Sequence, residues 1–190
     1  PFNTPGFYSN YFNGSTYLTT TTNSNYAFGT GDFTIECWAF NIGFNTWYPF
    51  CQSDAIGTST NNKWFFAISG GYIEFGTLST GGFSAYYYAN PSIGTWYHYA
   101  VTRTSGVIQL YVNGVPVTTT ITGTPSGYSL GQNGITIGAM SSPYYMNGYI
   151  SNVRIANSAL YSGTFTPSKT PLLPNSNTVM LAAQSATFKD

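Results

Sequence analysis

The residues best suited to acid–base chemistry in this chain are two carboxylates, Asp32 and Glu36, in the segment GDFTIECWAF. Residues four apart on a strand share a face, but at about 3.3 Å per residue they lie about 13 Å apart. Two carboxyl groups that hydrolyse a glycosidic bond are separated by roughly 5 Å in retaining enzymes and roughly 6.5 to 9.5 Å in inverting ones. The spacing fits neither mechanism. The other acids, Asp54, Glu74 and Asp190, stand alone in the sequence, and although folding could bring two of them together, we expect no catalytic residues and no enzyme.

Nucleophilic catalysis and zinc binding depend on histidine or cysteine, and the chain has few of either. Its one histidine, His98, lies in the strand-like segment WYHYAVTR, where we expect an imidazole hydrogen-bonded inside the sandwich rather than a general base. Cys37 and Cys51 also lie in strand-like segments. Their thiols would face each other if these strands formed a hairpin, but two reduced core cysteines are the favoured interpretation. One histidine and two cysteines do not make a zinc site of the usual spacing.

Aromatic rings beside amides and hydroxyls are abundant, and this is the chemistry of sugar recognition. A ring stacks on the C–H face of a pyranose, while Asn, Gln and Thr form hydrogen bonds with its hydroxyls. The candidate ligand-binding residues are Trp47, Tyr48, Trp64, Tyr86, Tyr87, Tyr88, Tyr144, Tyr145 and Asn62. About half of these rings are expected to pack in the core instead, because an alternating triplet of tyrosines directs at least one ring inward. Tyr144 and Tyr145 lie in a polar loop flanked by Pro and Gly, where exposure is expected most.

The overall composition excludes several classes of partner. Charged residues make up 5% of the 190 residues, with five basic groups balancing five acidic ones, whereas aromatics make up 18%. So few cations cannot neutralise a run of phosphates or bind an anionic membrane surface, so we expect no nucleic acid and no membrane as partner. No apolar run approaches the roughly 20 residues that span a bilayer. The chain begins at Pro1, which suggests a piece of a longer polypeptide.

The elements that position these residues are strands joined by turns. The segment 94–117, GTWYHYAVTRTSGVIQLYVNGVPV, predicts a three-stranded meander with a turn at 103–106 and a type I′ turn at Asn113-Gly114, which places Val112 opposite Val115. Further strand pairs are expected around Asn13-Gly14 and Gly70-Gly71. Turn signals recur at roughly ten-residue spacing, as in an all-β sandwich.

The last part of the chain is expected to be mostly extended. Residues 157–161 are the one candidate for a helical turn. We divide the chain into a jelly roll over residues 1–165 and a Pro-containing extended segment over residues 166–190, whose closing strand 179–183 returns to the same domain beside the first strand.

Three motifs taken together resemble a known family. They are GTGDFTIECWAF, the meander from Trp96 to Val117, and ITIGAMSSPYYMNGYISNVRIANSAL. In this order they are similar to the laminin-G-like branch of the concanavalin A-like lectin/glucanase domains, over about residues 11–161. The resemblance implies an all-β, two-sheet antiparallel jelly-roll sandwich. The closing stretch, residues 159–190, looks like the end of such domains in bacteriophage structural proteins, such as tail fibre or capsid decoration proteins.

Relatives of this kind often bind calcium at the rim of the sandwich, and Asp54 is the weak candidate here. Its loop also holds Ser53, Asn61 and Asn62, which offer oxygens but only one negative charge in all. Calcium takes six to eight oxygens, normally including carboxylates. A weak site remains open, but the expectation is that no cofactor is needed.

These observations favour a non-catalytic module that binds a neutral polysaccharide or cell-surface glycan, or mediates adhesion, on the exterior of a virion or extracellular appendage. A purely structural spacer is the alternative, and a glucanase-like hydrolase is less favoured. The chain has only three lysines, at positions 63, 169 and 189, so we expect its sheet edges to lack protection by charged side chains. An uncharged, aromatic surface with unguarded edges is tolerated inside an assembly, so we expect an oligomer with other subunits as partners.

Overall fold

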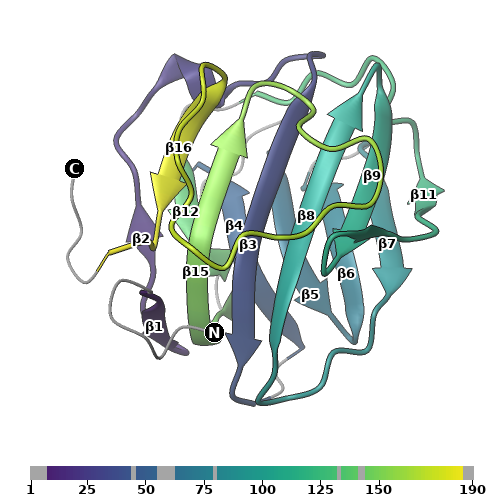
Figure 1. Ribbon diagram of the computed structural model, residues 1–190. Coiled ribbons are helices and arrows are strands. Elements are labelled where there is room, and N and C mark those ends of the chain that lie inside the picture. Colours follow the sequence, from purple (N-terminus) through teal and green to yellow (C-terminus); the bar gives the residue numbers. More distant parts are fainter. Residues whose placement is uncertain are drawn as a thin grey trace.

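In the computed structural model the chain folds into two antiparallel β-sheets packed face to face (Figure 1). The structure describes residues 8–43, 46–54, 63–78, 81–131, 134–140 and 144–185. The front sheet, nearer the viewer in Figure 1, contains β1 (Asn10–Asn13), β3 (Phe33–Asn41), β8 (Trp96–Thr104), β9 (Val107–Val112), β10 (Val115–Pro116), β15 (Asn147–Ala156) and β16 (Thr178–Ala182). The back sheet contains β2 (Leu18–Thr19), β4 (Trp47–Ser53), β5 (Trp64–Ser69), β6 (Tyr72–Thr77), β7 (Ser84–Tyr88), β11 (Thr120–Thr122) and β12 (Ile135–Ile137).

The strand order is β1-β15-β3-β8-β9-β10 in the front sheet, where β16 also pairs with β15, and β11-β7-β6-β5-β4-β12-β2 in the back sheet. A small pair, β13 (Ala139–Met140) and β14 (Tyr144–Tyr145), and a 3-10 turn at Ser24–Tyr26 complete the regular structure of the described residues. The predicted all-β two-sheet sandwich is confirmed. No helix in this part of the chain is long and apolar enough to cross a bilayer.

The core lies between the sheets and is built from the inward residues of alternating strands. On β3, Phe33, Ile35 and Cys37 point into it, as the period-two pattern predicts. Rings from opposite sheets meet there. Phe50 of β4 stacks on Tyr99 of β8 with centroids 4.9 Å apart. Each fully buried ring of this kind contributes roughly 1.5–3 kcal/mol of transfer free energy, so this layer is the main source of stability.

The predicted meander, β8-β9-β10, forms the edge of the front sheet that lies opposite β1. Asn113 and Gly114 have φ of 51° and 79°, and Val115 pairs with Val112, as the type I′ turn requires. The first turn lies later than predicted, at Ser105-Gly106, because β8 continues through Arg103 to Thr104. The hairpin about Gly70-Gly71 between β5 and β6 is also confirmed.

Arg103 is buried, although the sequence placed it in a turn. Its guanidinium donates to three backbone carbonyls, those of Gly29 (2.7 Å), Gly31 (2.8 Å) and Tyr128 (2.9 Å). It also lies 5.1 Å from the centroid of the Phe33 ring. Arg103 therefore fixes the loop before β3 against the sandwich. The guanidinium group suits this structural role because it presents several N–H donors in a fixed geometry and stays charged.

One expected strand pairing is wrong because partners distant in sequence prevail over a local turn. No hairpin forms at Asn13-Gly14, since β1 pairs with β15 in the front sheet and β2 pairs with β12 in the back sheet. The strands that hold Cys37 and Cys51 belong to opposite sheets and do not pair. Both cysteines are free and buried, in agreement with the favoured interpretation. Burial raises the pKa of both thiols.

The expected helical turn at 157–161 is also wrong, because this segment starts an extended strap (residues 157–177) that crosses the outer face of the front sheet in Figure 1. Contacts with the sheet take the place of helical hydrogen bonds. The Thr34 hydroxyl donates to the carbonyl of Ser158 (2.7 Å) and accepts from the amide of Leu160 (2.8 Å). Trp38 Nε1 donates to the carbonyl of Ser168 (2.8 Å). The strap leads to β16, which pairs with β15 rather than with β1.

The sheet edges are better protected than the lysine count suggests. Three of the outermost strands, β10, β11 and β2, are only two, three and two residues long, and β10 includes Pro116. At the opposite edge of the front sheet, β1 and β16 both pair with β15 and are four and five residues long. Very short edge strands and edge prolines both prevent pairing with another chain. The inference of unguarded edges is therefore wrong for β10, β11 and β2.

Candidate binding surface on the back sheet

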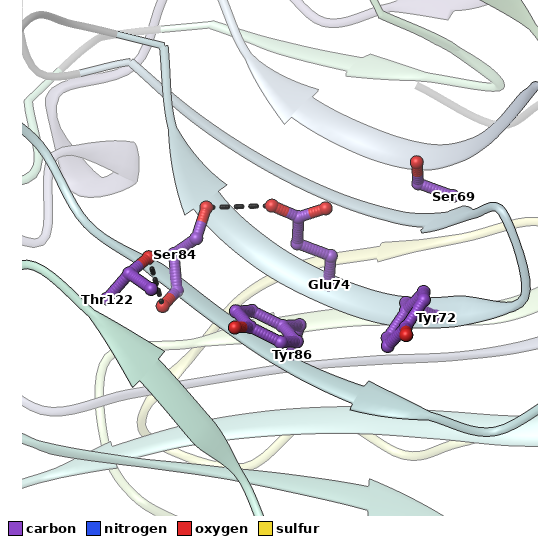
Figure 2. Close-up of a pocket in the computed structure, with 6 residues that line it drawn as sticks. All are labelled: Ser69, Tyr72, Glu74, Ser84, Tyr86 and Thr122. Atoms are coloured by element: carbon purple, nitrogen blue, oxygen red, sulfur yellow. Dashed lines mark hydrogen bonds between the residues drawn. The ribbon is translucent and has the colours of Figure 1, made fainter.

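The outer face of the back sheet gathers a group of tyrosines beside a carboxylate. Alternation along β6 and β7 directs Ile73, Phe75 and Ala85 into the core. The residues between them therefore point outward. We call the outward group the tyrosine site; it consists of Tyr72, Glu74, Ser84, Tyr86 and Tyr88, and Figure 2 shows the first four.

The rings of the tyrosine site support one another across the two strands. The Tyr72 ring is edge-on to Tyr86, with centroids 5.8 Å apart, and tilted against Tyr88 at 4.9 Å. Tyr72 and Tyr88 remain 41% and 53% exposed. Rings that are held in place by neighbours but open to solvent lose little conformational freedom when a ligand stacks on them.

An open depression of about 330 Å³ lies beside these rings. It is lined by Ser69, Tyr72, Glu74, Ser84, Tyr86 and Thr122, as Figure 2 shows. The lining combines two aromatic rings, three hydroxyl side chains of Ser and Thr, and one carboxylate. Small-molecule sites commonly pair an apolar wall with a few polar groups that fix orientation.

Glu74 is the charged group of this depression. It lies directly opposite Tyr86 across the strand pair, and its Oε1 accepts a hydrogen bond of 2.7 Å from the Ser84 hydroxyl. Burial raises the pKa of Glu74 above its ordinary value, and the Ser84 hydrogen bond offsets only part of that rise. No Lys or Arg in the described part of the chain forms an ion pair with Glu74.

A neighbouring aromatic patch on the same outer face contains two more of the predicted residues. Trp47 and Tyr144 lie with ring centroids 5.9 Å apart and pack with Phe65 and Met140. Tyr145 has its ring centroid 6.2 Å from that of Tyr17. Trp47, Tyr144 and Tyr145 are all half-buried, so Tyr144 and Tyr145 are less open than their loop-like sequence suggested.

Other predicted ligand-binding residues do not reach the surface. Tyr48 is 1% exposed and Trp64 is 0% exposed, both in the central core, so the expectation that these rings stack on a ligand is wrong. Their strand positions point between the sheets. Tyr87 alternates with Tyr86 and Tyr88 and packs partly against the core. Asn62, like Asn61, lies outside the described residues.

The sequence reasoning missed Ser84 of the tyrosine site, and it also missed Tyr72 and Glu74. The signal that could have found the latter two is the outward alternation of YIEF after the Gly70-Gly71 turn, which places both on the face opposite Ile73 and Phe75. A lone acid in sequence gave no indication that Ser84 and Tyr86, on the following strand, would join it.

The described residues near the calcium candidate Asp54 offer that metal a single carboxylate, and Asn61 and Asn62 of the same loop lie outside the described residues. No group of three His, Cys, Asp or Glu side chains gathers here or elsewhere in the ranges that the structure describes. The charge of Asp54 acts instead on Lys63, where it opposes the lowering of the lysine pKa by burial. A single carboxylate next to an ammonium group supplies few of the six to eight oxygen ligands that calcium takes.

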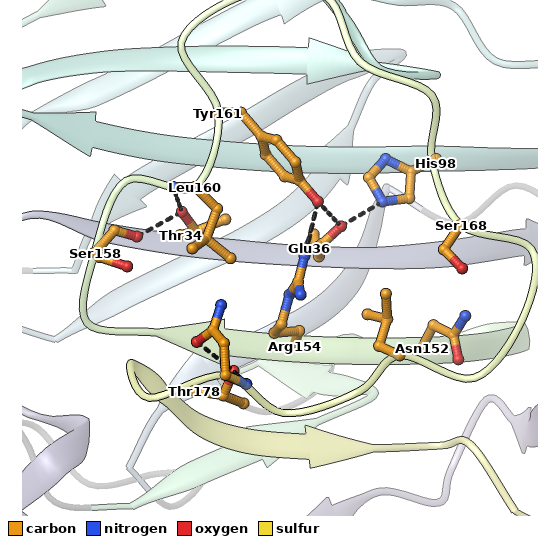
Figure 3. A network of polar contacts seen from close by, with 12 residues as sticks. Thr34, Glu36, His98, Asn152, Arg154, Ser158, Leu160, Tyr161, Ser168 and Thr178 are labelled. Carbon is orange, nitrogen blue, oxygen red and sulfur yellow. Dashed lines mark hydrogen bonds and ion pairs between the residues drawn. The ribbon is translucent and has the colours of Figure 1, made fainter.

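The opposite outer face, on the front sheet, holds a buried charge network beneath the strap (Figure 3). Glu36 Oε1 accepts from Arg154 Nε (2.6 Å), and the Tyr161 hydroxyl donates to both carboxylate oxygens (3.0 and 2.9 Å). His98 Nε2 lies 2.9 Å from Glu36 Oε2, where the ring N–H must donate because a carboxylate only accepts. His98 is thus a hydrogen-bonded buried histidine, as expected, although it lies under the strap rather than between the sheets.

This network is closed to ligands. Glu36 and His98 are 1% and 2% exposed. Burial by itself would raise the pKa of Glu36, but the hydrogen bond and charge of His98, the charge of Arg154 and the Tyr161 hydrogen bond together hold it below its ordinary value. Asp32, the other acid of that segment, instead accepts a hydrogen bond from the Ser105 amide (2.8 Å). The geometry is that of a structural ion cluster.

Beyond the strap, the front sheet carries a second aromatic surface. Tyr11, Tyr149, Phe40 and Trp96 lie side by side in register on β1, β15, β3 and β8, and we call them the aromatic row. Successive ring centroids are 5.1, 6.0 and 5.5 Å apart. Tyr11 is 55% exposed and the other three are half-buried.

Comparison with known proteins agrees with this architecture. A family model described as "Concanavalin A-like lectin/glucanases superfamily" matches residues 12–163. A search of curated proteins gave no significant match.

Among solved structures, domains LG4-5 of the mouse laminin alpha1 chain superpose with a TM-score of 0.61 at 16% identity, over 88% of this chain and 47% of that one. The native heptameric SAP-like pentraxin from Limulus polyphemus gives 0.60 at 14% identity, over 80% and 77%. The receptor binding domain of botulinum neurotoxin C/D mosaic serotype gives 0.60 at 14% identity, over 82% and 40%. The chain thus spans about half or less of the laminin and neurotoxin fragments, and at these identities the likeness concerns the fold.

Proposed function

This chain belongs to the concanavalin A-like lectin/glucanase superfamily, and we propose that it is a non-catalytic module that binds a glycan at the tyrosine site. The observation that supports this most is the open depression in which Tyr72 and Tyr86 adjoin Glu74 and three hydroxyl side chains. Tyrosine rings offer flat apolar faces to a pyranose, and the hydroxyls and carboxylate can pair with sugar hydroxyls. The fold neighbour from botulinum neurotoxin is a receptor binding domain, which is consistent with surface recognition.

The setting that we propose is the exterior of a virion or an extracellular appendage. It rests on the resemblance of residues 159–190 to the ends of such domains in bacteriophage structural proteins, and on the low charge of the chain. A shallow, open site binds one sugar weakly, so many copies on one particle would supply the affinity.

A glycan array followed by titration of the best ligand tests the proposal. We expect Tyr86→Ala to weaken binding about tenfold, because it removes a stacking ring worth about 1 kcal/mol. Tyr11→Ala is the matched control, since it removes an exposed tyrosine from the front sheet. Equal binding by wild type and Tyr86→Ala would contradict the assignment of this face.

A second candidate, a structural module that packs against neighbouring subunits, is favoured by the aromatic row. Four adjoining rings that are only partly buried form an apolar strip that a neighbour would cover. Sedimentation separates the two: Tyr11→Ala should weaken self-association if this strip is a contact, whereas Tyr86→Ala should leave it unchanged.

We also propose that the module does not hydrolyse glycans, because Glu74 is the one carboxylate that lines the depression. Acid–base cleavage of a glycosidic bond uses two carboxyl groups on either side of it. Release of reducing sugar from β-glucans by the wild-type chain, lost in Glu74→Gln, would overturn this.

A further inference from the structure

We propose that the tyrosine site selects a saccharide that carries a protonated amine, such as a deacetylated hexosamine. The inference rests on the proposed glycan binding and specifies its ligand. It follows from the chemistry that surrounds Glu74, which differs from that of a site built for neutral sugars alone.

The first step is that Glu74 lacks a counter-charge. Its one hydrogen bond within the described residues comes from the neutral Ser84 hydroxyl, at Oε1, and no Lys or Arg of this part of the chain forms an ion pair with it. A partly desolvated carboxylate without a cation is costly for a folded protein. Such a group in an open depression is a candidate for pairing with a charge brought by a ligand.

The second step is that the walls beside Glu74 attract cations. Tyr86 lies directly across the strand pair from Glu74, and Tyr72 is two residues before it on the same face. The face of a tyrosine ring attracts a cation within about 6 Å of its centroid. A carboxylate flanked by two rings therefore favours an ammonium group through two separate interactions, whereas a neutral amide gains neither in full.

The third step concerns the size and polarity of the depression. Its volume of about 330 Å³ exceeds what a bare ammonium ion fills, and it falls at the small end of the range for ligand sites. Ser69, Ser84 and Thr122 line it beside the rings, and these hydroxyls suit the hydroxyl groups of a sugar ring. The combination fits one sugar unit with its amine directed at Glu74.

The experiment compares two matched ligands, the β-1,4-linked tetramer of glucosamine and the tetramer of N-acetylglucosamine, which differ in charge but not in backbone. Titration calorimetry is run at low salt and at a pH where the amine is protonated, because exposed charge interactions are screened by salt. We expect the wild type to bind the amine form about fivefold more tightly, the size of a modest cation–π or surface charge contribution.

Two variants with the same change in net charge isolate the role of Glu74. Glu74→Gln should lose the preference for the amine, whereas Asp32→Asn should keep it, because Asp32 lies next to Ser105, outside the tyrosine site. Circular dichroism confirms that both fold. Equal affinity for the two tetramers overturns the inference and leaves the proposed glycan binding standing. A preference that survives Glu74→Gln overturns it as well. Binding of neither tetramer overturns it, and an array without hits then overturns the proposed function too.

Discussion

The two outer faces of this sandwich carry the same side chain, a glutamate in mid-strand, in opposite surroundings. Glu36 lies on β3 under the strap, with Arg154, His98 and Tyr161 all bonded to its carboxylate. Glu74 lies on β6 in an open depression, with a single hydrogen bond from Ser84. The pKa of Glu36 is lowered despite its burial, whereas burial raises the pKa of Glu74.

This difference distinguishes a charge that serves the fold from one that is available to a ligand. Around Glu36 every interaction is internal, so the carboxylate stabilises the strap and offers nothing to solvent. Burial disfavours the ionised form of Glu74, a property that carboxylates of ligand-binding sites often share. The two acids thus differ in how many internal partners they have, and this difference is the reason that we propose the back sheet as the binding face.

Glu36→Gln should give the largest effect on stability. It leaves Arg154 and His98 without their anionic partner beneath the strap, and loss of one member of a buried ion pair costs about 3–5 kcal/mol. Urea unfolding measures the change, with Glu74→Gln as the same substitution on the open face. A loss below about 1 kcal/mol would mean that the network contributes little.

Phe165→Ala should weaken the attachment of the strap and should lower the stability of the protein less than Glu36→Gln does. The Phe165 ring stacks on Tyr161 with centroids 3.5 Å apart and lies edge-on to His98 at 5.6 Å. Removing this half-buried ring should cost about 1–2 kcal/mol, less than deletion of a fully buried phenylalanine.

Hydrogen exchange shows which part of the protein Phe165→Ala destabilises. The amides of Leu160 and Phe165, which donate to Thr34 and to the Gly114 carbonyl, should exchange faster in Phe165→Ala than in wild type. Amides of β5 in the back sheet serve as the control. Uniform acceleration in both sheets would show that the strap does not open separately.

The dependence of stability on pH should have opposite signs for the two glutamates. The folded pKa of Glu36 lies below its ordinary value of 4.5, so its ionised form stabilises the protein above that pH, and this contribution is lost as the pH falls through the folded pKa. The folded pKa of Glu74 lies above 4.5, so its contribution is present below that pH and is lost as the pH rises through the folded pKa.

Urea unfolding between pH 3 and pH 7 tests both signs. The stability lost below about pH 4.5 should be smaller in Glu36→Gln than in wild type. The advantage of Glu74→Gln over wild type should grow from acid to neutral pH. Parallel curves for all three proteins would contradict the assignment of these two shifts.

The sequence predicted the sandwich well because its signals are local. Asn113-Gly114 specifies its turn through φ alone, and the alternation on β3 specifies which side chains enter the core. Site residues were harder to predict. In β4 the register shifts between Pro49 and Cys51, so Tyr48, Phe50 and Cys51 all reach the core. Local alternation cannot show such a bulge.

The strap and the tyrosine site escaped prediction for a related reason. The strap is extended because Thr34 and Trp38, more than 120 residues earlier, supply the hydrogen bonds that a helix would have made internally. The tyrosine site exists only once β6 and β7 pair and place Tyr86 opposite Glu74. Both depend on contacts between segments, which no single stretch of sequence contains.

Glu74→Gln should give the smallest effect on stability, and its sign is the sharpest test of the comparison. Glutamine can still accept from the Ser84 hydroxyl, but it removes a charge that burial disfavours. Because Glu74 remains partly open to water, we expect a gain of only a few tenths of a kcal/mol at neutral pH, measured by urea unfolding. Asp32→Asn, at an acid that accepts from a backbone amide, should give no such gain. If Glu74→Gln lowers stability, the carboxylate is satisfied in the fold after all, and the two faces differ in exposure but not in kind.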